Sequence, residues 1–254
     1  MLEKNQNGHI LELYIQTNEA NSLDATFFRT LKNTLIEAEQ NKSVKAILLS
    51  TKSEKYFSNG FNPEIFIGKS LQEIRTVLQD SLEVAGKILF CERPIVCAMP
   101  GHAMGLGAVY AIFCDYRIMV EKGGRIGFPE SQIGINFPST SGLVLKELVG
   151  ARAARDLLYS GRALKSDEAL QLGLIDHSCK PGELLSSARK WCAQFENMAL
   201  ESVVGIKAGI RDSLKPFVES QQKRDIELLG AAIHSRNGQE GMKSIVEKRR
   251  PVFV

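Results

Sequence analysis

The residues best suited to chemistry lie together between Pro94 and Gly134. In this stretch an apolar run at Pro94–Met99 leads through Gly105 and Gly107 into a second apolar run. We expect a buried strand followed by a helix, because short apolar runs separated by glycines are typical of that transition. The first N–H groups of such a helix have no intrahelical acceptor, and the helix dipole favours negative charge beside them. The stretch therefore predicts a backbone site for an anion or an oxyanion.

One carboxylate, that of Glu130, lies late in the same stretch. Its neighbours in the sequence are apolar: Ile126, Phe128, Ile133 and Ile135. Burial disfavours the charged form of a carboxyl group, so we expect a raised pKa and a better base than an exposed glutamate. The alternative is structural, with Glu130 capping a turn or pairing with Arg117 or Arg125. The glycines could likewise serve tight packing of strand against helix, and the same geometry would expose the amides.

The composition is that of an ordinary globular protein. The chain has 254 residues, of which 44% are hydrophobic and 24% charged, with a net charge of +3. This length fits one large α/β domain or a domain with a small appendage. Basic residues do not interleave with aromatic ones, and no apolar stretch is long enough to span a bilayer. We therefore expect neither nucleic acid nor a membrane as a partner.

The cysteines and histidines show no spacing typical of a metal site, so we expect no metal. The five cysteines are Cys91, Cys97, Cys114, Cys179 and Cys192. An odd number without a C-x-x-C pair, several of them in apolar runs, indicates free thiols in a reducing compartment. The N-terminus carries neither an apolar signal core nor an Arg-rich leader. We expect a cytoplasmic protein, or one of the mitochondrial matrix if a leader has been removed.

The elements that must position these residues alternate between strands and helices, which predicts an α/β fold. Strands are expected at Ile10–Ile15, Val44–Ser50, Pro94–Met99, Tyr116–Val120 and Leu174–Cys179. Helices are expected from the Asp24 cap to Ala38 and at Ser70–Phe90, Leu143–Val149, Ala151–Tyr159 and Asp167–Leu172. Thr51–Pro63 is expected to be a polar loop. Ligands collect at the carboxyl ends of strands in such folds, and two strand ends here lead into loops that contain glycine.

The pattern becomes wholly helical near Pro181. We divide the chain into a core at residues 1–180, which holds the ligand site, and a helical C-terminal part at 181–254. Helices are expected there at Trp191–Leu200, Ser202–Leu214, Phe217–Ser235 and Gly238–Lys248.

Four segments resemble motifs of the enoyl-CoA hydratase/isomerase, or crotonase, superfamily. They are Y-F-S-N-G-F at 56–61, G-H-A-M-G-L-G at 101–107, C-D-Y-R-I at 114–118 and F-P-E-S-Q-I-G at 128–134. The run from Ser160 to Asp176 also fits, so the resemblance covers nearly the whole chain. In this order the motifs are specific for the fold and less specific for the reaction. The resemblance implies a spiral of ββα units and a C-terminal helical part that forms a homotrimer or a dimer of trimers.

The resemblance also implies an acyl-CoA thioester as substrate, with no separate cofactor because coenzyme A is part of that substrate. It implies an oxyanion hole formed by the backbone N–H groups of Phe61 and Leu106 around the thioester oxygen. Glu130 takes the catalytic position. Substrate contacts are implied for Phe57, Ser58, Gly60, Gly105, Val109 and Pro129.

The chain departs from the hydratases of this family, which carry two glutamates, because Val109 stands at the first of those positions. A valine cannot hold a water, whereas the remaining carboxylate, Glu130, suits proton transfer between two carbons. This pattern resembles the Δ3,Δ2-enoyl-CoA isomerases of fatty acid metabolism, so we predict that the protein moves a double bond from C3 to C2. Asn62 replaces the usual aspartate of the first loop, and Leu106 replaces the commoner glycine or alanine.

Three other activities stay open from the sequence. The protein could catalyse another crotonase reaction such as acyl-CoA decarboxylation, it could be a weak enoyl-CoA hydratase that uses a further side chain, or it could bind acyl-CoA without catalysis.

Overall fold

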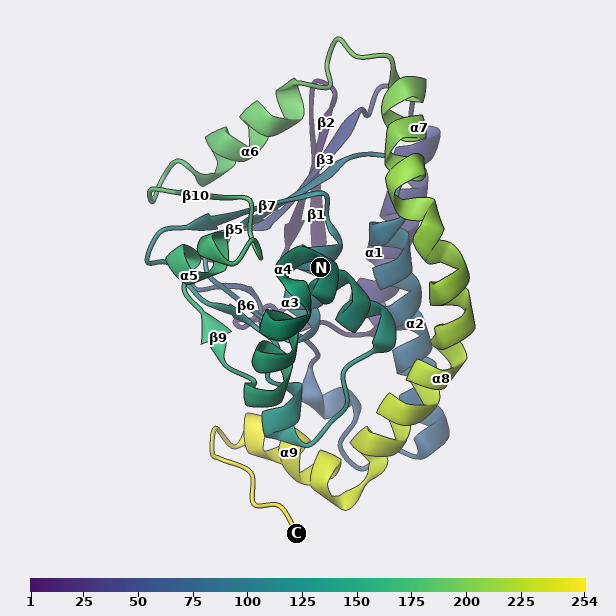
Figure 1. Cartoon of the computed structure of the whole chain (residues 1–254), viewed down its shortest axis with the longest axis vertical. Helices are drawn as coiled ribbons and strands as arrows, with labels where there is room; N and C mark the ends of the chain where they lie inside the picture. Colours follow the sequence, from purple (N-terminus) through teal and green to yellow (C-terminus); the bar gives the residue numbers. More distant parts are fainter.

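The computed structural model describes all 254 residues, Met1–Val254, and contains two sheets surrounded by helices (Figure 1). The larger sheet has the strand order β1-β2-β3-β5-β7-β10 and the smaller one β4-β6-β8-β9. The strands are β1 Leu2–Asn7, β2 Ile10–Ile15, β3 Ala46–Thr51, β4 Tyr56–Ser58, β5 Ile95–Met99, β6 His102–Met104, β7 Tyr116–Val120, β8 Ile126–Gly127, β9 Ala163–Leu164 and β10 His177–Cys179. The larger sheet is parallel except for β1, and the smaller one is parallel except for β9.

The helices follow the strands in a repeating order. They are α1 Ala25–Gln40, α2 Leu71–Leu89, α3 Leu106–Phe113, α4 Ser139–Ser160, α5 Ser166–Gln171, α6 Leu184–Ala193, α7 Leu200–Arg211, α8 Lys215–His234 and α9 Arg236–Val246, with short 3-10 helices η1 Pro63–Ile65, η2 Glu130–Ile133 and η3 Asp212–Leu214. Three times the chain passes from a strand of the larger sheet to one of the smaller sheet and then into a helix: β3–β4–α2, β5–β6–α3 and β7–β8–α4. This is the spiral of ββα units that the sequence predicted.

The main core lies on the face of the larger sheet toward α1, α2 and α3, where 41 buried residues form one hydrophobic cluster. The opposite face is covered by α6, whose Leu184, Ala188 and Cys192 pack against residues of β3, β5 and β7. Helix α6 thus lies after residue 180 in the chain and still packs on the core sheet. The division of the chain into a core at residues 1–180 and a helical part at 181–254 stays a prediction. All five cysteines are buried and free, as expected.

The start of α1 follows the predicted chemistry, because the Asp24 carboxylate accepts the N–H of Phe27 at 2.9 Å. Helix α2 begins with a capping box of Ser70 and Glu73, which was not predicted. Helix α4 breaks at Gly150, whose φ of 79° and ψ of 159° are not helical, so the two helices predicted on either side of this glycine are confirmed.

Other predictions were wrong. The segment Thr51–Pro63 is not only a loop, because it contains β4, and the polar strand β1 was not predicted at all. The helix expected at Trp191–Leu200 lies at Leu184–Ala193 instead. Its apolar residues Leu184, Ala188 and Cys192 are four positions apart, so they lie on one face of the helix and pack on the sheet. The last strand is limited to His177–Cys179. Short or polar strands carry no alternating apolar pattern, so their pairing was not visible in the sequence.

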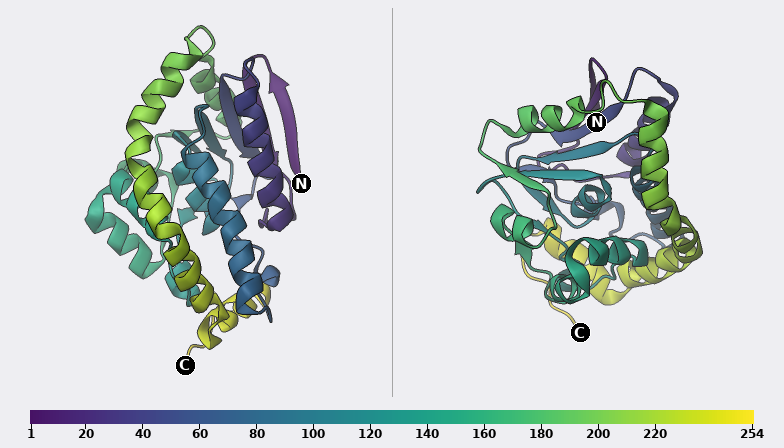
Figure 2. Two further views of the ribbon diagram at one scale, coloured as in Figure 1. Left: turned by 90° about the vertical axis from the view of Figure 1, so that its right-hand side faces the viewer. Right: turned by 45° about the horizontal axis from the view of Figure 1, so that its top comes forward.

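The C-terminal helices run along the outside of the core (Figure 2). Helix α8 packs lengthwise against α2, and α9 lies against η1 and η2. Each of the helices is too short or too polar to cross a membrane.

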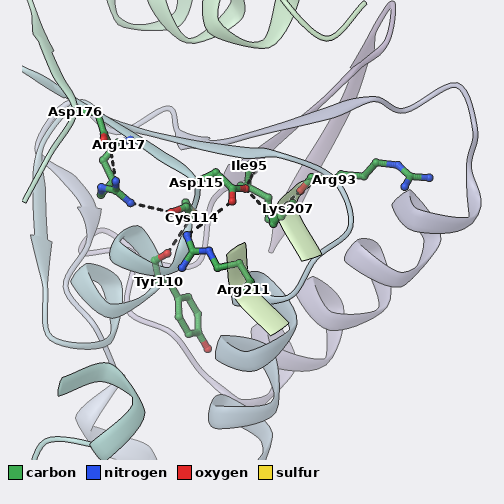
Figure 3. A network of polar contacts seen from close by, with 9 residues as sticks. All are labelled: Arg93, Ile95, Tyr110, Cys114, Asp115, Arg117, Asp176, Lys207 and Arg211. Atoms are coloured by element: carbon green, nitrogen blue, oxygen red, sulfur yellow. Dashed lines mark hydrogen bonds and ion pairs between the residues drawn. The ribbon is translucent and has the colours of Figure 1, made fainter. Parts of the chain in front are cut away.

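A buried ion pair attaches α7 to the core (Figure 3). The Asp115 carboxylate accepts the N–H of Ile95 at 2.7 Å and the Lys207 ammonium at 2.6 Å, and Lys207 also donates to the carbonyl of Arg93 at 3.1 Å. Lys207 is the one buried residue of α7. These contacts give Asp115 a structural role at the start of β7.

We expect the substitution Lys207→Met to lower the free energy of unfolding by roughly 2–3 kcal/mol, because it leaves a largely buried carboxylate without its nearest cation. The measurement is urea unfolding followed by circular dichroism. Lys4→Met is the control, since its ion pair with Glu37 is exposed and should contribute less than about 1 kcal/mol. Equal losses in the two variants would show that the Asp115 pair does not anchor α7.

Candidate active site

The site is built where two short strands, β4 and β6, pair in parallel and bring the loops that follow them together. Glycine is required on both sides of this contact. A Cβ on Gly107 would lie 2.6 Å from the carbonyl oxygen of Ser58, and a Cβ on Gly60 would lie 2.9 Å from that of Met104. Gly60 also has a φ of 83°, which side chains of L-residues rarely permit. The glycines therefore allow the two backbones to approach closely.

Two backbone N–H groups at this contact remain without protein acceptors. Leu106 is the first residue of α3, so its N–H has no intrahelical acceptor. In the other loop, hydrogen bonds link Leu23 N–H to Gly60 O at 2.8 Å and Asn62 N–H to Leu23 O at 2.9 Å, and the N–H of Phe61 between them donates to nothing. These are the two donors predicted for an oxyanion hole, and that role stays a prediction.

The two loops form one wall of a cavity of about 180 Å³. The cavity wall is mainly apolar, and Glu130 is the only residue in it with an ionisable side chain. The C-terminal helices complete it through Leu229 of α8 and through Met242 and Ile245 of α9. The helical C-terminal part therefore closes the site of its own chain.

Glu130 is the first residue of η2 and directs its carboxylate toward the second loop, since a Cβ on Gly105 would lie 3.6 Å from its Oε1. Its Oε2 is buried and accepts no hydrogen bond. Burial in these surroundings raises the pKa of Glu130 to about 7, which confirms the predicted direction. The alternative ion pairs do not form, because Arg117 pairs with Asp176 at 2.6 Å and Arg125 donates to the carbonyl of Ala163.

The remaining predicted contacts divide into two groups. Four of them line the cavity: Gly60, Gly105, Val109 and Pro129. Phe57 and Ser58 do not, which differs from the expectation of substrate contact. Phe57 is fully buried in the main core, and the Ser58 hydroxyl donates to the carbonyl of Asn21 at 2.8 Å and accepts the N–H of Gly60 at 3.2 Å. These two residues hold the first loop in place instead.

Sequence reasoning missed the part of the cavity that distant segments provide. Leu229, Met242 and Ile245 are ordinary apolar residues of amphipathic helices, and Ser141 is a serine in the first turn of α4. No local pattern distinguishes such residues from others of the same type, because only the packing of α8 and α9 brings them to the site.

The sequence profile described as "Enoyl-CoA hydratase/isomerase" matches residues 5–254. The chain belongs to this enoyl-CoA hydratase/isomerase family. Among curated relatives, the crotonyl-CoA hydratase of Syntrophomonas wolfei is 26% identical over 256 residues, covering 100% of this chain and 97% of the relative. The short-chain-enoyl-CoA hydratase of Clostridium acetobutylicum is 26% identical over 236 residues, covering 91% of this chain and 88% of the relative.

Solved structures of the family have the same fold. The human mitochondrial delta3-delta2-enoyl-CoA isomerase superposes with a TM-score of 0.93 at 23% identity, covering 97% of each chain. An enoyl-CoA hydratase/isomerase from Pseudoalteromonas atlantica gives a TM-score of 0.88 at 29% identity, covering 100% of this chain and 99% of that one. The predicted crotonase fold is thus confirmed, and with it an enzyme of this family.

The raised pKa of Glu130 predicts a pH-dependent stability. Its value in the fold is about 7 against an ordinary value of 4.5, so between these pH values the folded chain holds a proton that the unfolded chain has lost. We expect the wild type to lose up to about 3 kcal/mol of stability relative to Glu130→Gln as the pH rises from 4.5 to 7.5. Urea unfolding of both proteins across this range measures it. A difference that stays constant with pH would contradict the buried state of the carboxyl group.

The close contact of the loops predicts a strong effect of Gly60→Ala. The added methyl group would push against the backbone beside Leu106, so we expect turnover of an enoyl-CoA substrate to fall about 100-fold, the cost of a lost oxyanion donor. Gly68→Ala is the matched control, because Gly68 has a φ of 70° but open space around it. Both variants should lose stability through backbone strain, Gly60→Ala more because of the collision, and only Gly60→Ala should lose activity.

Proposed function

We propose that the protein is an isomerase that moves the double bond of a 3-enoyl-CoA from C3 to C2. The observation that supports this most is the single carboxylate in the cavity, Glu130, with Val109 at the position where hydratases of the family carry a second glutamate. A lone acid with a pKa of about 7 can both accept and return a proton at neutral pH. Hydration would need a second group that orients a water, and the apolar side chain of Val109 cannot serve as one.

In the proposed mechanism the thioester oxygen accepts hydrogen bonds from the N–H groups of Phe61 and Leu106. This withdraws electrons from C2 and acidifies its protons. Glu130 removes one of them, the C2 electron pair becomes part of a dienolate, and the negative charge rests on the thioester oxygen. The same carboxyl group then delivers the proton to C4, which leaves the double bond between C2 and C3.

A hydratase is the second candidate, because the curated relatives described above are named as hydratases of crotonyl-CoA and short-chain enoyl-CoA. Decarboxylation and acyl-CoA binding without catalysis remain as further alternatives. Incubation with 3-enoyl-CoA and with 2-enoyl-CoA, followed by the position of the double bond and the amount of 3-hydroxyacyl product, separates the two leading candidates.

Assembly as a homotrimer, or as a dimer of trimers, is part of the same proposal. It is supported by the apolar side chains of Ile206 and Ile210 on α7, which are 63% and 68% exposed in the single chain. Sedimentation velocity tests the assembly.

Glu130→Gln tests the proposed chemistry. The amide keeps the shape of the side chain but cannot accept the C2 proton, so we expect isomerisation of a 3-enoyl-CoA to fall by roughly 100- to 10,000-fold. Glu64→Gln is the control, since Glu64 is exposed on η1 and outside the cavity. Near-normal isomerisation by Glu130→Gln would end the proposal, whereas hydration without isomerisation by the wild type would favour the hydratase.

A further inference from the structure

Two buried polar atoms without a hydrogen-bond partner belong to residues that line the same cavity. One is Oε2 of Glu130, and the other is Oγ of Ser141. The proposed isomerase mechanism uses the carboxylate and leaves the serine unused. Ser141 is only 1% exposed, so bulk water does not satisfy its hydroxyl group. A buried hydroxyl without a partner destabilises a fold, which makes this serine unexpected in a mainly apolar wall.

At the start of α4, one carboxylate binds the two residues before Ser141 but not Ser141 itself. The Asp225 carboxylate accepts the N–H and the hydroxyl of Ser139, at 2.8 Å and 2.6 Å, and also the N–H of Thr140, at 3.5 Å. The next residue is Ser141, whose N–H and hydroxyl both lack an acceptor. Because these donors lie in the first turn of a helix, the helix dipole favours an electronegative atom beside them.

A second serine in the same cavity shows the contrast. The Ser81 hydroxyl donates to the carbonyl of Leu78 at 2.9 Å, and the Ser81 carbonyl accepts the hydroxyl of Tyr110 at 3.2 Å. Ser81 therefore has structural partners in α2 and α3, whereas Ser141 has none. Ser141 also forms, with Leu82, the partition between this cavity and a second one of about 500 Å³ between α2 and α8.

We propose that Ser141 is a specificity-determining residue that hydrogen-bonds a hydroxyl oxygen inside the acyl pocket. The oxygen comes either from a hydroxyl group carried on the acyl chain or from a water molecule held beside it. The inference rests on the proposed function only in placing the acyl group in this cavity. It assigns to Ser141 the recognition of this oxygen, whether the pocket holds an acyl chain that carries a hydroxyl group or an enoyl chain with a water beside it.

The water source implies a second reaction. With a 2-enoyl thioester bound, the water oxygen would form a bond to C3 while one of its protons passes to the Glu130 carboxylate. The π electron pair would move into the enolate held by the backbone amides, and the carboxyl group would then protonate C2. The product is a 3-hydroxyacyl thioester, and Glu130 is ionised again at the end.

Ser141→Ala tests the proposal, with Ser81→Ala as the matched control. We would measure the affinity for 3-hydroxybutyryl-CoA and for butyryl-CoA by titration calorimetry, and the rates of crotonyl-CoA hydration and 3-hexenoyl-CoA isomerisation. If a hydroxyl group on the acyl chain is the partner, Ser141→Ala should lower the affinity for 3-hydroxybutyryl-CoA about five- to tenfold more than the affinity for butyryl-CoA. If water is the partner, hydration should fall by a similar factor more than isomerisation. Ser81→Ala should change the two affinities by the same factor, and the two reaction rates by the same factor.

Thermal unfolding separates this role from a structural one. Removing an unpartnered hydroxyl should leave Ser141→Ala as stable as the wild type or more so, whereas Ser81→Ala should be less stable. Equal effects of Ser141→Ala on both ligands and on both reactions would overturn the proposal. The binding comparison requires no turnover, so it can succeed or fail whether or not the protein proves to be an isomerase.

Discussion

The close contact between the loops after β4 and β6 is the constraint on which the rest of the site depends. At Gly60 and Gly107 the two backbones approach so closely that a single methyl group on either would collide with the opposite chain. This approach places Phe61 and Leu106 along one cavity wall, and it needs the parallel pairing of the two short strands behind it. The smaller sheet thus aligns two loops, and its Phe57, Ala103, Ile126 and Leu164 also belong to the main core.

The second requirement is the removal of water from around Glu130. The ββα core provides the loops and Val109, and the C-terminal helices add the apolar side chains that complete the enclosure. The resulting burial raises the pKa of the carboxyl group into the range where it can both accept and release a proton. The same burial destabilises the ionised fold, so the chemistry of the site and the stability of the protein are opposed at neutral pH.

Local chemistry made much of this architecture predictable. The cap at Asp24, the break at Gly150 and the raised pKa of Glu130 each depend on a few adjacent residues. The short strands β4 and β6 were not predicted, since their pairing partners are distant and their apolar pattern is brief. Ser141 was missed for the same reason, because only the packing of distant segments leaves its buried hydroxyl group without a partner.

The closure of the cavity by α9 has a consequence for the synthesis and the proteolysis of the protein. Met242 and Ile245 follow every other pocket residue in the chain, so the apolar enclosure can form only after α9 has been synthesised. A protease that removed α9 would leave the strands of the ββα core in the chain but would open the pocket to solvent. Without α9, water would reach Glu130, and the burial that raises the pKa of its carboxyl group would be reduced.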